Sequence, residues 1–404
     1  MPAARTDRWT LVVCLSRIFL FATFMTVAAV IPLLKDAWAI SAVEAGAIVT
    51  AFTIAYAVSL FVFGWAADHI GAKRAVQISA VGSALASAAF GFLAHDWTSA
   101  LLLYANVGLW QGGIYTPLVM LFAERSAPER RGTAMGWLIA STSLGYAFSL
   151  AVSGIGIALG GHMAAFALTG ALPAIGTLIL LFALHPLPNR VHRRSPALGL
   201  SGALFRNREA RLLTAGYTAH SWELLGGWAW MPTLIAASLA LSGSGLLDAS
   251  GKSAWLTAAM HVLGASAAFS IGMLSDRFSR RSVLLGVALA ASVLSLSIGW
   301  LVALPALVLA LIGLVHAFLT IGDSPVLTTA ITEVVEPGYL GAVLAVRALF
   351  GFGAGAVAPI AAGFVLDAAG AGGLGPSAAW GLTFGLLGLG GLLAAWCAHA
   401  LKAT

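Results

Sequence analysis

Charged side chains are scarce in this sequence, and their scarcity excludes a soluble fold. Lys, Arg, Asp and Glu together make up 9% of the 404 residues, whereas hydrophobic residues make up 60%. Soluble domains usually contain about 25% charged and about 45–50% apolar residues. The same apolar excess excludes an intrinsically disordered chain, which is poor in hydrophobic residues. The composition therefore predicts a protein that crosses the membrane many times.

Cysteine is nearly absent, which excludes a disulfide-stabilised scaffold. Cys14 and Cys397 both fall within long apolar runs, so we expect buried thiols. No His and Cys residues have the spacing of a zinc site. Gly251-Lys252-Ser253 resembles the end of a phosphate-binding loop, but Leu246 stands where the first glycine belongs. We therefore expect no metal, no ATP and no other cofactor.

Long apolar runs recur along the whole chain and determine its architecture. Runs of about 18 or more apolar residues predict transmembrane helices, and their continuous hydrophobicity is not the alternating pattern of membrane strands. We predict an all-α integral membrane protein with twelve transmembrane helices in two six-helix bundles. The predicted spans are residues 9–34, 42–66, 74–94, 99–123, 133–159, 163–184, 212–240, 253–275, 282–301, 305–330, 340–366 and 378–400.

The placement of Lys and Arg predicts the orientation. Of the 21 basic residues, all but four fall on the side of the two termini; Lys35 and Lys252 lie on the other side, and Arg17 and Arg347 lie within spans. By the positive-inside rule, both termini are predicted to be cytoplasmic, in the inner membrane of a bacterium. This asymmetry accounts for the net charge of +6 without a nucleic-acid partner.

The two halves of the chain repeat each other. The predicted N-terminal bundle covers residues 1–189, a basic cytoplasmic linker covers residues 190–211, and the C-terminal bundle covers residues 212–404. Residues 64–74 (GWAADHIGAKR) follow the second predicted span, and residues 272–281 (GMLSDRFSRR) follow the eighth. Both halves keep one orientation because six is an even number of spans. Parallel repeats of this kind are an architecture of secondary transporters.

Twelve spans in two sixes, a basic central loop and the G-x-x-x-D-x-x-G-x-K/R-R pattern after the second span resemble the major facilitator superfamily. In that family this loop is a gating latch, in which the aspartate caps a neighbouring helix and pairs with basic residues. The resemblance implies a gating role for both copies, although the second has Ser279 in place of a glycine; the alternative is that these charges only fix the topology. The gating residues would be Gly64, Asp68, Gly71, Lys73 and Arg74, and Gly272, Asp276, Arg277, Arg280 and Arg281.

Subfamily motifs match less well. Proton-driven drug exporters of the family carry an arginine three residues before Gln-Gly in span four, where this chain has Gly108. They also carry Gly-Pro in span five, where Tyr146 follows Gly145 here. Residues 221–230 faintly resemble the nitrate/nitrite and cyanate porter relatives. Nitrate porters use arginines in spans two and eight, however, and this chain has none there.

Ionisable residues inside the predicted spans are candidates for proton coupling, since each needs a partner or a water-filled cavity. Glu223 lies near the middle of span seven, and His220 lies on the same helix face. In span ten, Asp323 and His316 share a face and form a candidate proton relay. The alternative for Glu223 is a carboxyl fixed to a neighbouring helix, and that for the histidines is hydrogen-bonded packing.

Two arginines lie at a similar depth in the cytoplasmic third of the predicted membrane region. Arg17 and Arg347 can each bind a carboxylate or another oxyanion through two parallel hydrogen bonds. Alternatively, they extend to the cytoplasm or pair with Asp323 or Glu223 as a gate.

These residues predict a secondary active transporter that moves a small organic or inorganic anion by alternating access coupled to protons. Arg17, Arg347, Gln111 and Trp222 are the predicted substrate-binding residues; Trp222 alternatively faces lipid. The second hypothesis is a proton-coupled exporter of amphipathic or cationic compounds that bind Glu223 and Asp323. A membrane enzyme or a channel is disfavoured. We expect a monomer whose partners are the substrate, protons and membrane lipid.

Overall fold

The computed structural model describes residues 8–125, 131–191, 204 and 206–402. Within these ranges the chain forms helices and no strand. The helices of the first half are α1 (Arg8–Leu20), α2 (Thr26–Ala37), α3 (Ala42–Ile70), α4 (Ala72–Leu93), α5 (Trp97–Gln111), η1 (Gly112–Ile114), α6 (Tyr115–Arg125) and α7 (Arg131–Leu184). Those of the second half are α9 (Arg208–Leu241), α10 (Leu246–Arg277), α11 (Arg280–Ile298), η3 (Gly299–Leu301), α12 (Ala306–Val334), α13 (Pro337–Ala371) and α14 (Pro376–Ala400).

The described helices agree with the twelve predicted crossings. Nine of them are long and apolar enough to cross a membrane. Among these, α7 contains two crossings joined at Gly160 and Gly161, and Gly161 has a φ of 69°, which side chains other than glycine rarely adopt. The remaining two crossings are α1 with α2 and α5 with η1 and α6. The predicted fold is therefore confirmed.

The first crossing is broken where the sequence predicted one continuous span. Residues 21–25 form a turn between α1 and α2, so nearby carbonyl groups lose their helical partners and need others. The Tyr104 hydroxyl donates hydrogen bonds to the carbonyls of Thr23 and Phe24, at 3.2 and 2.5 Å. The Gln111 amide donates to the carbonyl of Leu20 at 2.6 Å. Side chains of α5, in the fourth crossing, therefore stabilise the break.

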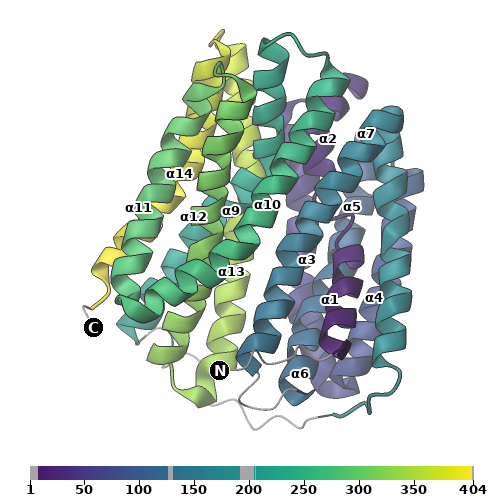
Figure 1. The fold of residues 1–404 in the computed structure, drawn as a ribbon, viewed down its shortest axis with the longest axis vertical. Helices are drawn as coiled ribbons and strands as arrows, with labels where there is room; N and C mark the ends of the chain where they lie inside the picture. Colours follow the sequence, from purple (N-terminus) through teal and green to yellow (C-terminus); the bar gives the residue numbers. More distant parts are fainter. Residues whose placement is uncertain (1–7, 126–130, 192–203, 205, 403–404) are drawn as a thin grey trace.

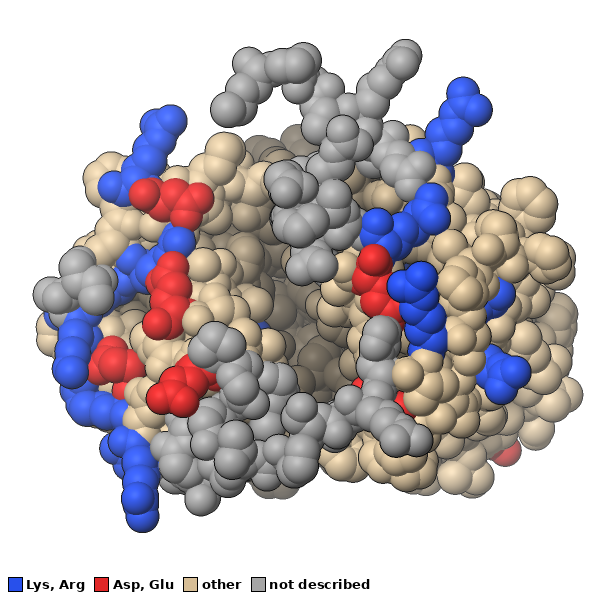
Figure 2. Space-filling view, turned by 90° about the horizontal axis from the view of Figure 1, so that it is seen from below, with Lys and Arg blue, Asp and Glu red and all other residues tan. Residues whose placement is uncertain are grey.

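The helices form two side-by-side halves, one containing α1–α7 and the other α9–α14, with both ends of the described chain at the same end of the molecule (Figure 1). We call that end the basic face and the opposite end the far face. The halves contact each other mainly through α3 against α13 and α7 against α10. Figure 2 shows the basic face, which is hollowed by a deep recess between the two halves.

The halves are joined tightly toward the far face. The Asp367 carboxylate at the end of α13 accepts hydrogen bonds from the backbone amides of Ala42 and Val43, each at 2.8 Å, at the start of α3. Negative charge is favoured at a helix N-terminus, where the amides lack helical partners. The Thr50 hydroxyl donates to the carbonyl of Ala356 at 2.6 Å. The structure is therefore closed at the far face and recessed at the basic face.

Candidate functional site

Arg17 on α1 is completely buried, although an arginine in a membrane span is costly to bury. Its guanidinium donates to the Ser141 hydroxyl at 3.0 Å, to the Thr142 hydroxyl at 2.9 Å and to the carbonyl of Leu138, all on α7. Its Nε atom has no hydrogen-bond partner. No carboxylate among the described residues forms an ion pair with it. The positive charge is held in place by neutral groups.

Arg347 on α13 occupies a similar environment in the other half. It is 6% exposed, its Nη2 donates to the Thr328 hydroxyl at 2.9 Å, and its Nη1 has no hydrogen-bond partner. The guanidinium carbon lies 4.0 Å from the centre of the Tyr217 ring, a favourable cation–π distance. In the described part of the chain it too lacks an acidic partner.

Four tyrosines surround these arginines and bring the two halves together at one site. Tyr56, Tyr115 and Tyr146 lie close enough to Arg17 for electrostatic interaction. Arg347 interacts in the same way with Tyr115 from the first half and with Tyr217 from its own half. The chain has only six tyrosines, so this concentration is marked. We call the set Arg17, Tyr56, Tyr115, Tyr146, Tyr217 and Arg347 the arginine–tyrosine site.

An aromatic layer covers this site on the side of the far face. Phe24, in the break after α1, stacks on Tyr146 with 4.2 Å between ring centres. Tyr146 contacts Trp228 of the second half at 5.2 Å, and Tyr56 contacts Phe352 of the second half at 5.5 Å. Because α1 begins at the basic face and Arg17 precedes Phe24, the arginine lies on the basic side of this layer. The layer thus brings aromatic rings of both halves into contact at the site.

The geometry limits what the arginines can do. An expected alternative was that they extend their charges to water, but both side chains are buried and held by hydroxyl or carbonyl groups. A second alternative was an ion pair with Glu223 or Asp323, and neither acid lies within ion-pair distance of them. Those two expectations are wrong. A buried cation that lacks a counter-ion is unfavourable unless a ligand supplies the charge.

Glu223 points into the second half, toward α11 and α14. Its Oε1 accepts a hydrogen bond from the Ser295 hydroxyl at 2.6 Å, and that hydroxyl lies 2.7 Å from Nε2 of His316. On the α14 side, Glu223 packs against Gly391, where an added Cβ would come within 2.4 Å of Oε2. Glu223, Ser295 and His316 therefore form a continuous hydrogen-bonded chain across three helices.

His220 and Asp323 form a second polar pair close to the first. Nδ1 of His220 lies 3.1 Å from Oδ1 of Asp323, and its Nε2 lies 2.9 Å from the Ser324 hydroxyl. His220 is within electrostatic range of both Glu223 and Arg347. His316 and Asp323 therefore have different hydrogen-bonding or ion-pair partners, and the relay between them stays a prediction. The seven-residue spacing places both on one face, but α11 and α9 supply a different partner for each.

The other two predicted substrate residues, Gln111 and Trp222, form hydrogen bonds with backbone carbonyls. Gln111 is fully buried and its amide supports the break in the first crossing. The indole nitrogen of Trp222 donates to the carbonyl of Leu386 on α14 at 3.2 Å, so the ring turns to the outer side of the second half. The geometry gives both residues structural contacts.

The first copy of the loop motif is bound to the segment after α7. Lys73 donates to the carbonyls of His185 and Leu187, at 3.1 and 2.6 Å, whereas the family resemblance implied an acidic partner. The amide of Arg74 donates to the side-chain oxygen of Asn189 at 3.3 Å. Gly71 has a φ of 90°, and a Cβ there would lie 2.3 Å from the same oxygen. The turn therefore requires glycine at this position. Gly64 and Asp68 precede this turn on α3.

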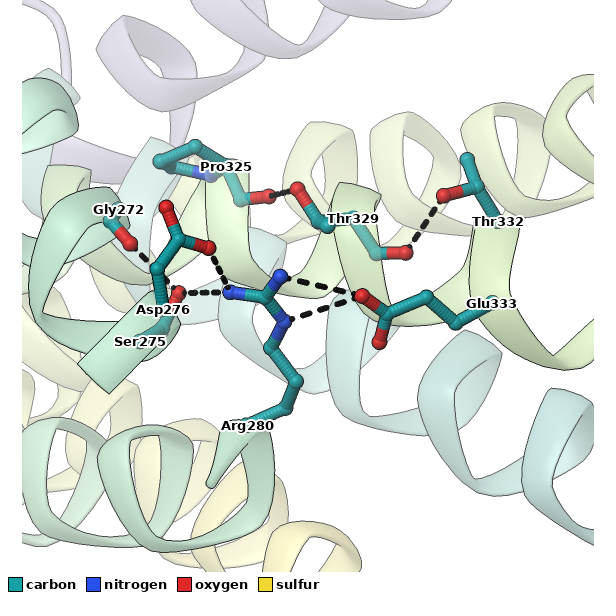
Figure 3. A network of polar contacts seen from close by, with 8 residues as sticks. All are labelled: Gly272, Ser275, Asp276, Arg280, Pro325, Thr329, Thr332 and Glu333. Carbon is teal, nitrogen blue, oxygen red and sulfur yellow. Dashed lines mark hydrogen bonds and ion pairs between the residues drawn. The ribbon is translucent and has the colours of Figure 1, made fainter. Parts of the chain in front are cut away.

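The second copy forms a network within its own half (Figure 3). Arg280 donates to Asp276 at 2.7 Å and to Glu333 at 3.1 Å, and the hydrogen bond with Glu333 raises the pKa of Arg280. Arg281 donates to the carbonyl of His399 at 3.0 Å. Gly272 and Arg277 belong to α10, the helix that ends at this network. The network joins α10, α11 and α12, and all of its contacts with described residues lie within the second half.

Replacing Asp367 by Asn is expected to weaken the contact that closes the far face. A hydrogen bond to a charged group is worth about 1.5–3 kcal/mol, so the ratio of far-face-closed to far-face-open molecules should fall by about 10- to 100-fold. Spin labels at Asp36→Cys and Lys252→Cys, exposed on the two halves at the far face, would report longer distances.

The control for this experiment is Asp96→Asn. Asp96 accepts a hydrogen bond from the amide of Ser99 at 2.7 Å, which lowers its pKa, and it caps α5 within one half. An unchanged distance distribution in Asp367→Asn, or an equal change in Asp96→Asn, would show that Asp367 does not hold the halves together.

Sequence reasoning missed the tyrosines and Asp367. Tyrosine is compatible with apolar spans, so its position alone carries no signal. A usable signal was that few tyrosines exist and that most of them fall within spans. Asp367 lies just after the predicted eleventh span, and nothing in the sequence shows that its partner is the start of α3.

Comparisons with known proteins agree with this architecture. Residues 13–322 match the family model described as Major Facilitator Superfamily. The fold is similar to that of a bacterial homologue of the human lysosomal transporter Spinster in an inward-facing, unoccupied conformation, with a TM-score of 0.76, 15% sequence identity, and 98% of this chain and 97% of that chain covered. No curated protein sequence matches significantly.

Two further solved structures share the fold. A variant of the nucleoside transporter NupG has a TM-score of 0.77 and 14% identity, with 97% of this chain and 99% of that chain covered. A D-xylose–proton symporter has a TM-score of 0.72 and 15% identity, with 94% of this chain and 95% of that chain covered. At these identities the likeness concerns the fold.

Proposed function

Because the chain belongs to the major facilitator superfamily and is therefore a transporter, we propose that it moves a small organic anion across the membrane together with protons. The observation that carries this proposal is the arginine–tyrosine site. Two buried guanidinium groups, one from each half, lack an acidic partner among the described residues. An anion bound between them would supply the missing charge, and the four tyrosine hydroxyls would add hydrogen-bond donors.

The surroundings favour an organic over an inorganic anion. The aromatic layer of Phe24, Tyr146, Trp228, Tyr56 and Phe352 borders the same site. Covering the apolar part of a ligand with such a surface makes the free energy of binding more favourable, whereas a small hydrated ion would leave the aromatic surface uncovered. Sites of this kind combine mostly apolar walls with a few placed polar groups. We therefore infer a carboxylate with an apolar body.

Proton coupling would follow from the position of His220. A proton on His220 is repelled by Arg347, which lies within electrostatic range, and an anion beside Arg347 would offset that repulsion. Each would then favour binding of the other, since coupling between two sites is reciprocal. Protons would reach Glu223 through the Ser295–His316 chain. This arrangement supports symport of the anion with a proton.

The cation-exporter hypothesis has less support. Its cation-binding acids would be Glu223 and Asp323, but Glu223 faces Ser295 and Gly391, and Asp323 faces His220. Neither faces the arginine–tyrosine site, and a cation there would meet two arginines. We also propose that the basic face is cytoplasmic in a bacterial inner membrane, that the protein works as a monomer, and that the recess is the inward-facing state of alternating access.

Reconstituted proteoliposomes test the function. Vesicles with a proton gradient should accumulate labelled benzoate or phenylacetate, and collapse of the gradient by a protonophore should release the accumulated label. Nitrate and sulfate should compete weakly. Efflux of tetraphenylphosphonium or ethidium against a gradient, with no movement of any anion in the panel, would support the exporter and contradict this proposal.

A further inference from the structure

A second, separate cavity lies on the outer side of the second half. It is a groove of about 610 Å³ between α9, α13 and α14. Its walls include Ala215 and Trp222 of α9, Phe350 of α13, and Leu389 of α14. Phe350 and Leu389 are 50% and 56% exposed, so the groove opens toward the surrounding membrane. None of the residues of the arginine–tyrosine site lines it.

The polar atoms of the groove wall are mostly satisfied within the protein. The indole nitrogen of Trp222 is bonded to the carbonyl of Leu386, and the hydroxyl of Thr218 is bonded to the carbonyl of Thr214 at 2.9 Å. The surface offered to a ligand is therefore almost entirely apolar. The groove is about 16 Å long along α9, because Arg211 and Trp222 at its two ends are eleven residues apart on that helix.

Among the described residues that line this groove, Arg211 is the one with a charged side chain. It is exposed in the first turn of α9, near the basic face. The guanidinium has no hydrogen bond or ion pair with a described residue, whereas the neighbouring Arg208 is bonded to Glu209 and to the carbonyl of Ala400. The groove thus has a free cation at the membrane surface and an apolar floor that runs toward the middle of the membrane.

We propose that this groove binds an anionic phospholipid, with the phosphate at Arg211 and an acyl chain along α9 toward Trp222. A phospholipid in the leaflet at the basic face presents its charged and apolar parts in the same order and direction as the groove. Arginine is well suited to phosphate because its donors match two phosphate oxygens, and basic pockets between membrane helices bind anionic head groups. The site is independent of the proposed transport path.

Native mass spectrometry of the full-length protein tests the proposal. Titration with dioleoylphosphatidylglycerol should show one tightly bound lipid in the wild type, and dioleoylphosphatidylcholine should bind at least tenfold more weakly. Arg211→Gln should lose at least tenfold in affinity for phosphatidylglycerol and remain unchanged for phosphatidylcholine. Arg206→Gln removes an exposed charge beside the start of α9 and outside the groove, so it should bind like the wild type.

A second variant tests the apolar part of the groove separately from the charge. Ala215→Phe leaves Arg211 intact but fills the groove, and it should bind both lipids less well. Equal binding of phosphatidylglycerol by the wild type, Arg211→Gln and Ala215→Phe would overturn the proposal, because it would indicate ordinary annular lipid. A photoreactive side chain at Leu389 should crosslink to phospholipid; a crosslink to the 190–207 segment would show that the chain itself fills the groove.

Discussion

Arg17→Gln and Arg347→Gln should each reduce accumulation of benzoate by about 30-fold or more. Truncating one partner of a buried charge pair costs about 2–5 kcal/mol, and about 1.4 kcal/mol is a factor of ten in binding. Both arginines contribute because they come from opposite halves and the anion would bridge them. Initial uptake rates in proteoliposomes at equal protein content measure the effect.

Loss of transport through misfolding would look different from loss of the site. Arg347→Gln removes a buried charge that has a single hydrogen bond, so the melting temperature of the ligand-free protein should stay level or rise. Arg347→Lys keeps the charge without the planar fork and should retain intermediate activity. The matched control is Arg190→Gln, an exposed position in the segment after α7, which should transport normally. Normal uptake by either buried-arginine variant would remove that residue from the site.

Glu223→Gln should abolish proton-driven accumulation while leaving anion exchange across the membrane measurable. Glutamine keeps the size of the side chain and can still accept the hydrogen bond from Ser295, but it cannot carry a proton. Exchange needs only the arginine–tyrosine site, which Glu223 does not contact. Accumulation under a proton gradient and counterflow with no gradient are the two measurements to compare.

The control for this second prediction lies on the same helix. Glu209→Gln removes a carboxylate in the first turn of α9, where it pairs with Arg208 at the surface, and it should leave both activities unchanged. If Glu223→Gln still accumulates the anion at the wild-type rate, Glu223 has a structural role only. If it loses exchange as well, the residue is needed for the conformational change itself.

The twelve crossings could be predicted from the sequence because apolar runs in a membrane protein are long and continuous. The break in the first crossing could not, since residues 21–25 are as apolar as their neighbours. The break depends on Tyr104 and Gln111, which supply hydrogen bonds from distant parts of the chain. Such support is visible only when the helices are packed.

The two arginines of the candidate site could be predicted from the sequence, but their partners could not. Arg17 and Arg347 stand out because charge is rare and costly within spans. Their partners do not stand out, because helical periodicity gives the face of a residue and not the helix that it meets. His316 and Asp323 share a face of α12, yet one meets Ser295 and the other His220.

Ligand-dependent melting of the purified protein tests the central claim most directly. An anion that binds the folded state stabilises it by about 2.7 kcal/mol at a concentration of 100 times Kd. We expect benzoate or phenylacetate to raise the melting temperature of the wild type and of Arg190→Gln, and to have no effect on Arg17→Gln or Arg347→Gln. Stabilisation by tetraphenylphosphonium that persists in both buried-arginine variants, with none by any anion, would contradict the account.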